Sequence, residues 1–203
     1  MNRSRGTDAM RLFIALNLPD AWKTALEDLQ GQMQSAISER LGPAVRPRWV
    51  RPDGIHLTLK FLGETPSSRI EALTTALAQA VPQPPGFDLS LGRVGSFEQR
   101  RAPRVILATV AVQGSVLIDL YQRIETWLAA AGWPREERSF HPHLTLARLP
   151  DTLDDATRHA VATLSTSFEA PQTPVWRVDR VCLIRSQLGP GGARYERLAA
   201  FPS

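Results

Sequence analysis

The tetrad histidine, leucine, threonine, leucine occurs twice in this chain, at residues 56–59 and again at residues 143–146. Both copies alternate polar and large apolar residues with a period of two, which predicts strands with one buried face and one free face. Residues two positions apart in a strand point to the same side, so each free face carries a histidine and a threonine. Two such strands, if brought together, would supply two imidazoles and two hydroxyls to one cleft.

The elements predicted around the two tetrads also repeat. The order strand, helix, strand, helix, strand covers about residues 11–97 and again about residues 104–184, where the last strand is predicted over residues 175–184. A final strand is predicted at residues 194–200. Because the matching order accompanies the matching tetrads, an internal duplication is the most economical interpretation.

A duplicated unit tends to pack about a pseudo-twofold axis, and the motif strands are the natural candidates to meet there. We therefore expect an α+β fold in which duplicated β-α-β-α-β units form mixed or antiparallel sheets flanked by helices. The expected domain is a single bilobal one over residues 11–203, with the active-site cleft between the lobes. Residues 1–10 are small and polar, and we expect them to form a disordered tail.

Composition excludes few functional classes. The 203 residues can bury a substantial core, and the net charge of +4 permits an anionic substrate without requiring one. No run approaches the roughly 18 apolar residues of a membrane span. The apolar stretch at residues 12–18 is short and runs straight into Pro19 and Asp20, so we do not expect a signal peptide, and the single cysteine, Cys182, excludes an internal disulfide framework. We expect a cytoplasmic monomer that has no membrane partner.

The free faces of the motif strands carry the candidate catalytic groups. In the first strand, the period of two puts Lys60 on the face of His56 and Thr58 and turns Phe61 toward the core. In the second strand, His143 and Thr145 share a face. Neither motif face carries a carboxylate, which argues against a mechanism that depends on Asp or Glu.

Two imidazoles across a reacting centre can serve as base and acid in one turnover, because their pKa lies close to neutrality. Neighbouring hydroxyls can donate hydrogen bonds to an oxyanion. This set of groups, with a nearby Lys or Arg, suits the in-line opening of a phosphodiester, of which a strained cyclic phosphate is an easy case.

The paired tetrads resemble the signature of the two-histidine phosphoesterase superfamily. Their longer contexts, at residues 11–16, 56–64 and 141–148, resemble the bacterial and archaeal RNA 2',3'-cyclic phosphodiesterases, also called 2'-5' RNA ligase-like proteins. The resemblance implies hydrolysis of an RNA 2',3'-cyclic phosphate end to a 2'-phosphomonoester, with no metal or cofactor. It leaves open whether the substrates are tRNA fragments, other oligonucleotides or small cyclic nucleotides, and whether reverse 2'-5' ligation also occurs.

The resemblance also implies roles for particular residues. His56 would be the proton donor to the departing 3'-oxygen, and His143 would be the proton acceptor from water. Thr58 and Thr145 would bind phosphate oxygens, and Arg148 would match an arginine that contacts the phosphate. Strand parity puts Arg148 on the wrong face, so this role requires a β-bulge or the end of the strand just before it.

Three further residues are candidates for substrate binding. Lys60 lies beside the first motif, although it could equally be a solvated surface residue. Phe13 is either a core residue or a stacking partner for a base. Tyr195, after the glycine-rich turn, could line the substrate groove or be an ordinary strand aromatic.

Two alternative functions remain open from the sequence. The first is a non-catalytic module that binds phosphorylated RNA ends. The second is a zinc-dependent phosphohydrolase, because His141 and His143 form a His-x-His pair that could bind zinc together with a distant histidine. Pro142 would disturb a strand at this point, and no carboxylate or thiol is near in sequence, so we expect no metal.

Overall fold

The structure, a computed structural model, describes residues 9–97, 102–189 and 192–202. The strands are β1 (Ala9–Asn17), β2 (Arg48–Trp49), β3 (His56–Pro66), β4 (Phe87–Gly95), β5 (Val105–Val112), β6 (His143–Arg148), β7 (Trp176–Val178), β8 (Val181–Gly189) and β9 (Gly192–Phe201). The helices are α1 (Asp20–Leu41), α2 (Ile70–Ala80), α3 (Val116–Ala130) and α4 (Asp155–Ser165). Short 3-10 turns at Pro52–Gly54 and Ser67–Arg69 flank β3.

The strands form one nine-stranded sheet with the order β7-β4-β5-β6-β3-β1-β8-β9, and β2 pairs with β6 outside this path. Every pairing between the described strands is antiparallel. The predicted α+β class is therefore confirmed, and of the two predicted kinds of sheet the antiparallel one is present.

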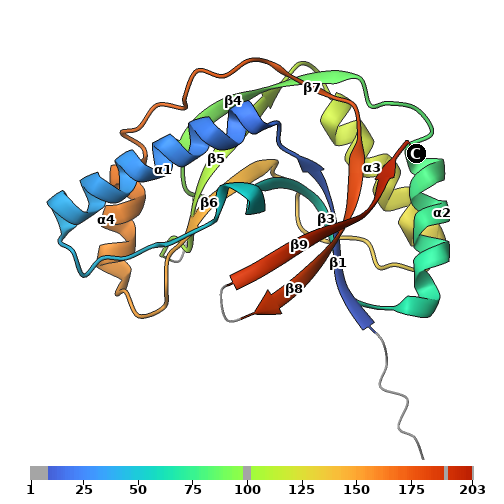
Figure 1. The fold of residues 1–203 in the computed structure, drawn as a ribbon, viewed down its shortest axis with the longest axis horizontal. Helices are drawn as coiled ribbons and strands as arrows, with labels where there is room; N and C mark the ends of the chain where they lie inside the picture. The colour runs from blue at the N-terminus through green and yellow to red at the C-terminus, as the bar shows by residue number, and fades with distance from the viewer. Residues whose placement is uncertain (1–8, 98–101, 190–191, 203) are drawn as a thin grey trace, which may run out of the picture.

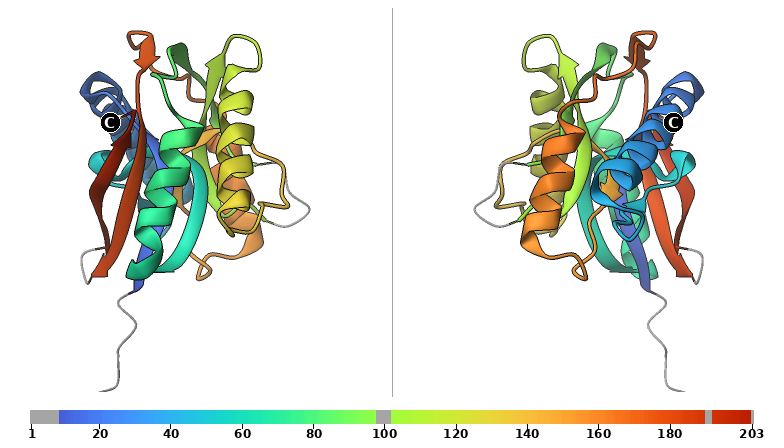
Figure 2. Two further views of the ribbon diagram at one scale, coloured as in Figure 1. Left: turned by 90° about the vertical axis from the view of Figure 1, so that its right-hand side faces the viewer. Right: turned by 90° about the vertical axis from the view of Figure 1, so that its left-hand side faces the viewer.

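The sheet has two similar halves that meet between β3 and β6. Helices α2 and α3 lie side by side over the half that contains β3, β1, β8 and β9, and α1 and α4 lie over the other half (Figure 1; Figure 2). The first strand of each sequence repeat pairs with the last strand of the other repeat, β1 with β8 and β5 with β4. Each half of the sheet is consequently built from both halves of the chain.

Alternate residues of β1 pack on opposite sides of the sheet. Leu12, Ile14 and Leu16 join the large core that the helices cover, whereas Phe13 and Ala15 belong to a small separate cluster on the other side. This strand is therefore buried on both faces of the sheet.

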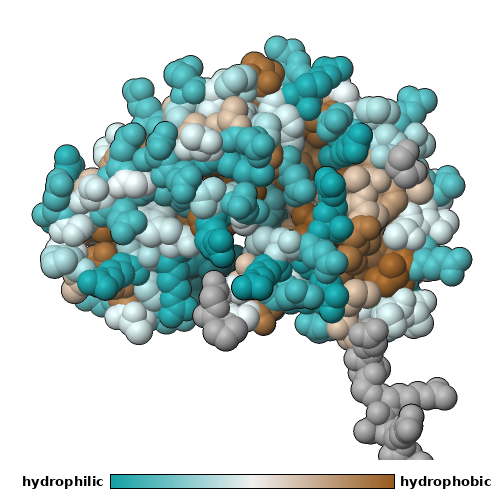
Figure 3. All heavy atoms as spheres, in the orientation of Figure 1, coloured by the Kyte–Doolittle hydropathy of each residue, from teal (hydrophilic) through white to brown (hydrophobic). Residues whose placement is uncertain are grey.

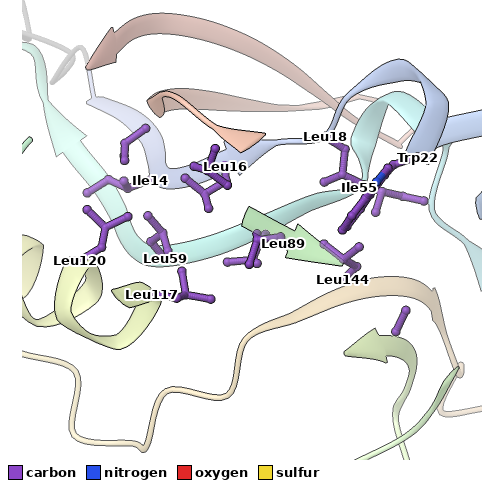
Figure 4. Packing of buried hydrophobic residues seen from close by; sticks show 14 of the residues in the cluster. Ile14, Leu16, Leu18, Trp22, Ile55, Leu59, Leu89, Leu117, Leu120 and Leu144 are labelled. Carbon is purple, nitrogen blue, oxygen red and sulfur yellow. The ribbon is translucent and has the colours of Figure 1, made fainter. Parts of the chain in front are cut away.

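The large core joins the sheet to the helices through branched apolar side chains. Figure 4 shows Leu59 of β3 beside Leu117 and Leu120 of α3, all of them almost fully buried. Trp22 of α1 is completely buried, and its indole donates a hydrogen bond to the Pro174 carbonyl at 2.8 Å. Burying each such side chain contributes about 1.5–3 kcal/mol, so both halves of the sheet are firmly fixed to their helices.

Three predicted boundaries differ from the structure. The strand predicted over residues 175–184 is two strands, β7 and β8, which lie in opposite halves of the sheet. Of the tail predicted over residues 1–10, residues 1–8 lie outside the described part of the chain, and Ala9 and Met10 belong to β1. The final strand, β9, is longer than predicted because it pairs along the whole length of β8.

The surface in the view of Figure 1 is mostly hydrophilic, with apolar side chains in small patches (Figure 3). Among the described residues, no helix combines the length and the apolar character that crossing a membrane requires.

Candidate active site

The two motif strands meet at the seam of the sheet. Strands β3 and β6 pair through one residue pair, Leu57 with Leu144, each of which directly follows the histidine of its tetrad. Carrying this antiparallel register one residue to either side puts His56 opposite Thr145, and Thr58 opposite His143. Opposed residues in such a pair have Cβ atoms about 4.5–5.5 Å apart. The antiparallel seam thus gathers two His–Thr pairs with twofold pseudo-symmetry.

A cleft of about 590 Å³ opens over this seam. Its lining includes seven of the eight residues predicted for the site, namely Phe13, His56, Thr58, His143, Thr145, Arg148 and Tyr195. The structure therefore brings together the imidazoles, the hydroxyls and the arginine. The eighth residue, Lys60, does not line the cleft.

A β-bulge explains where Lys60 lies. In the pairing of β1 with β3, Ala15 is opposite Thr58 but Ile14 is opposite Lys60, so Leu59 is an extra residue. One extra residue reverses the alternation of the strand, which turns Phe61 toward the cleft and Lys60 away from it. Phe61 is 62% exposed and lines the cleft, so the prediction that it faces the core is wrong.

Lys60 is a buried structural residue and does not contact the site. Its ammonium group lies 2.6 Å from the Glu125 carboxylate of α3 and donates a hydrogen bond to the Pro134 carbonyl at 2.8 Å. The two charged side chains are only 6% and 4% exposed. Both sequence-based interpretations of Lys60, a phosphate contact and a solvated residue, are therefore incorrect.

The second motif strand carries the same bulge. Strand β5 pairs Leu107 with Thr145 and Ile106 with Ala147, which leaves Leu146 as the extra residue. The bulge turns Arg148 to the side of Thr145, where the guanidinium lines the cleft. Of the two ways predicted for Arg148 to reach the site, a β-bulge or the end of the strand before it, the structure has the bulge. Position 61 in the first copy corresponds to position 148 in the second, so a phenylalanine and an arginine occupy equivalent places in the cleft.

Each of the two candidate histidines is influenced by the backbone carbonyl two residues before it. The Nδ1 atom of His143 lies 2.7 Å from the His141 carbonyl oxygen, and the Gly54 carbonyl favours the protonated form of His56. A carbonyl can only accept, so Nδ1 of neutral His143 carries the proton and its Nε2 is left as an acceptor. This tautomer can take a proton from water.

Burial lowers the pKa of both histidines. The His56 pKa is lowered from 6.5 to about 4, mainly because burial removes water from the charged form. Repulsion from Arg148 and His143 lowers the pKa further, whereas the Gly54 carbonyl raises it. The His143 pKa is also lowered, chiefly by desolvation and further by the charges of His141 and Arg148, although the bond to the His141 carbonyl opposes this. Both imidazoles are consequently neutral at pH 7 in the free protein. A bound anion would favour their protonation.

Aromatic rings enclose His56. Phe13 stacks on the imidazole with ring centroids 4.5 Å apart, and the edge contact of Tyr195 has a centroid distance of 5.2 Å. Phe13 is only 2% exposed, so its interpretation as a core residue is confirmed, and the alternative of a stacking partner for a base is wrong because the ring has almost no free surface. The ring instead supports His56 from below. Tyr195 is 39% exposed and lines the cleft as predicted.

The sequence reasoning missed Phe97. This residue contacts the His143 ring edge-on at 4.7 Å and His141 at 6.2 Å, and it lines the cleft. It ends the strand predicted over residues 87–97, and nothing in its local pattern separates it from a core aromatic. Its role depends on the pairing of β4 with β5 and of β5 with β6.

The His-x-His pair was the candidate zinc site. His141 is exposed, and its Nδ1 lies 2.9 Å from the Ser139 carbonyl. Within the described part of the chain, no three His, Cys, Asp or Glu side chains gather in a way that could hold a metal ion.

An α+β fold whose antiparallel sheet has two His-x-Thr strands at its centre is typical of the two-histidine phosphoesterases. The model of the 2'-5' RNA ligase superfamily matches residues 18–190, and the chain belongs to that family. A relative from Thermus thermophilus named RNA 2',3'-cyclic phosphodiesterase is 30% identical over 95% of this chain and 89% of its own length.

A second relative with the same name, from Geobacillus stearothermophilus, is 28% identical over 94% of this chain, and the match spans 56% of that longer protein. Among solved structures, Escherichia coli LigT complexed with 3'-AMP superposes with a TM-score of 0.68 at 27% identity, covering 96% of this chain and 98% of that one.

Proposed function

We propose that the protein is an RNA 2',3'-cyclic phosphodiesterase that opens a terminal cyclic phosphate to a 2'-phosphomonoester. The convergence of His56 and His143 on one cleft carries this proposal. The shared name of the relatives from Thermus and Geobacillus and the 3'-AMP in the LigT complex support it.

In the proposed reaction, Nε2 of His143 takes a proton from a water molecule while the oxygen of that water attacks phosphorus. The bond from phosphorus to the 3'-oxygen breaks, and protonated His56 delivers a proton to that oxygen. The phosphate gains hydroxide and remains attached through its 2'-oxygen, so that atoms and charge balance. Thr58, Thr145 and Arg148 hold the non-bridging oxygens, where negative charge grows in the transition state.

The relation of the two histidines to the seam suits this chemistry. In-line displacement puts the attacking and leaving oxygens on opposite sides of phosphorus. The pseudo-symmetric seam puts one imidazole on each strand, so that one faces the water and the other faces the leaving oxygen. Phe61 and Arg148 at equivalent positions make the two sides unlike, and an asymmetric substrate could then bind in one orientation.

The direct test is incubation of the purified protein, in the presence of a chelator, with an oligoribonucleotide that ends in a 2',3'-cyclic phosphate. We expect a 2'-phosphomonoester, identified by phosphorus NMR. A 3'-phosphate product would contradict the proposal. Binding of the cyclic end without turnover would favour the RNA-end-binding alternative, and activity that is lost in chelator and restored by zinc would favour the metal-dependent one.

The pH dependence of the reaction follows from the lowered pKa values. The active state has one protonated and one neutral imidazole, and a lowered pKa means that the protonated form exists only at lower pH. Because kcat/KM reports the free enzyme, its bell-shaped profile is expected to peak below pH 6.5. The kcat profile should lie at higher pH, since bound phosphate raises both pKa values. Initial-rate measurements from pH 4 to 9 give the kcat and the kcat/KM profiles. Coincident profiles that peak above pH 7 would contradict acid and base catalysis by two histidines of lowered pKa.

A further inference from the structure

The catalytic cleft continues into a second hollow of about 580 Å³. The two share Val50, Gly54, Arg148, Ala193 and Tyr195, so they form one continuous depression with Arg148 and Tyr195 at the junction. We call the outer part the arginine groove, because Arg48, Arg51 and Arg194 line it.

The arginine groove has an excess of free positive charge. Arg48, Arg51, Arg148 and Arg194 are all exposed, and within the described residues none of the four is in an ion pair with a carboxylate. The single carboxylate in the lining is that of Asp53, which lies 3.8 Å from the Lys23 ammonium. The groove therefore offers several guanidinium groups to an anion.

The pairing of β2 with β6 strengthens this argument. The register sets Arg48 directly opposite Arg148. Like charges in directly opposed positions of an antiparallel pair are destabilising, so this arrangement lowers the stability of the free protein. Departures of this kind from local consistency are typical of functional sites. A polyanion that runs from Arg148 to Arg48 would remove the repulsion.

We propose that the arginine groove binds the phosphates of the nucleotides that precede the cyclic end, so that the enzyme acts on an RNA strand in preference to a cyclic mononucleotide. This inference rests on the proposed function. The cyclic phosphate is a 3' terminus, and the remaining chain can leave the reacting centre only in the 5' direction. Guanidinium groups that follow a strand through its phosphates give affinity without sequence preference.

The test compares two substrates, a 2',3'-cyclic mononucleotide and a pentaribonucleotide with a 2',3'-cyclic end. We expect the pentanucleotide to have the higher kcat/KM at low salt, with an advantage that shrinks as salt is raised. Arg48→Ala, Arg51→Ala and Arg194→Ala should each lower kcat/KM for the pentanucleotide by about 3- to 10-fold, mainly through KM, and leave the mononucleotide within about twofold of wild type. Each lost phosphate contact should reduce the slope of log(kcat/KM) against log salt by about 0.7.

Arg123→Ala is the matched control, because it removes another exposed arginine, one on α3, and should affect neither substrate. Equal losses on both substrates in the groove variants would overturn the inference, since they would place these residues at the reacting phosphate. Unchanged pentanucleotide kinetics in all three variants would overturn it too. Failure of the wild-type protein to hydrolyse either substrate would instead reject the proposed function.

Discussion

His56→Ala and His143→Ala are each expected to lower kcat for a cyclic-ended oligoribonucleotide by about 10²–10⁴-fold, because each removes one of the two proton transfers of the reaction. Initial rates under saturating substrate measure the loss. KM should change little, since Thr58, Thr145 and Arg148, which hold the phosphate in the proposed mechanism, still line the cleft.

The two variants can be told apart by the leaving group. A substrate with sulfur in place of the 3'-bridging oxygen departs as a thiolate and needs no proton. We therefore expect this substrate to restore turnover to His56→Ala and not to His143→Ala. The opposite pattern would exchange the acid and base roles, and rescue of neither variant would argue against acid catalysis by His56.

His141→Ala and His159→Ala are the controls for these variants. His141 is exposed and lies next to the site. His159 lies on α4, where its Nδ1 is hydrogen-bonded to the Asp155 carbonyl of the same helix. Both should retain activity close to that of wild type, because the bond to His143 comes from the backbone of residue 141 and not from its side chain. Circular dichroism and thermal melts of all four variants establish that the fold is intact.

Lys60→Ala and Glu125→Ala are each expected to lower the free energy of unfolding by about 3–5 kcal/mol, because either change leaves an uncompensated charge in the core. Lys60→Ala also removes the hydrogen bond to the Pro134 carbonyl. Glu125→Ala also removes the hydrogen bond that the Glu136 backbone N–H donates to the Glu125 carboxylate at 3.2 Å. Urea titration measures the change. This loss is a large part of the 5–15 kcal/mol that typically stabilises a domain of this kind.

The double variant Lys60→Met with Glu125→Leu removes both charges together. It therefore measures the net contribution of the ion pair to stability, without the destabilisation that a single unpaired buried charge causes. Apolar replacements of similar volume leave no unpaired charge, so this variant should be far more stable than either single one. The exposed pair of Arg177 and Asp88, 3.2 Å apart, is the matched control, and its removal should cost about 0–1 kcal/mol. Equal losses from the buried and the exposed pair would contradict the structural role of Lys60.

Much of the site could be predicted because it depends on local alternation. Over residues 56–58 and 143–145 the period of two holds, and His56, Thr58, His143 and Thr145 all reach the cleft. Beyond these positions each strand has a bulge, and the same rule then assigns the wrong face. Lys60 and Phe61 exchanged their expected places for this reason alone.

The bulge in β6 depends on residues far away in the sequence. The Leu146 carbonyl accepts hydrogen bonds from the Val50 amide at 2.9 Å and from the Gln30 side chain at 2.8 Å. A local pattern carries no information about such partners. The same holds for Phe97, which reaches His143 across neighbouring strands.

The sequence by itself determined the chemistry of this protein, because two His-x-Thr strands in a repeated order of elements already imply two imidazoles and two hydroxyls on free faces. The tertiary structure alone decided which residues surround them. The antiparallel seam set each histidine opposite the other strand's threonine, and the bulges turned Arg148 toward the cleft and Lys60 into a buried ion pair. Long-range hydrogen bonds and packing fix these features, and they exist only when both halves of the chain have come together.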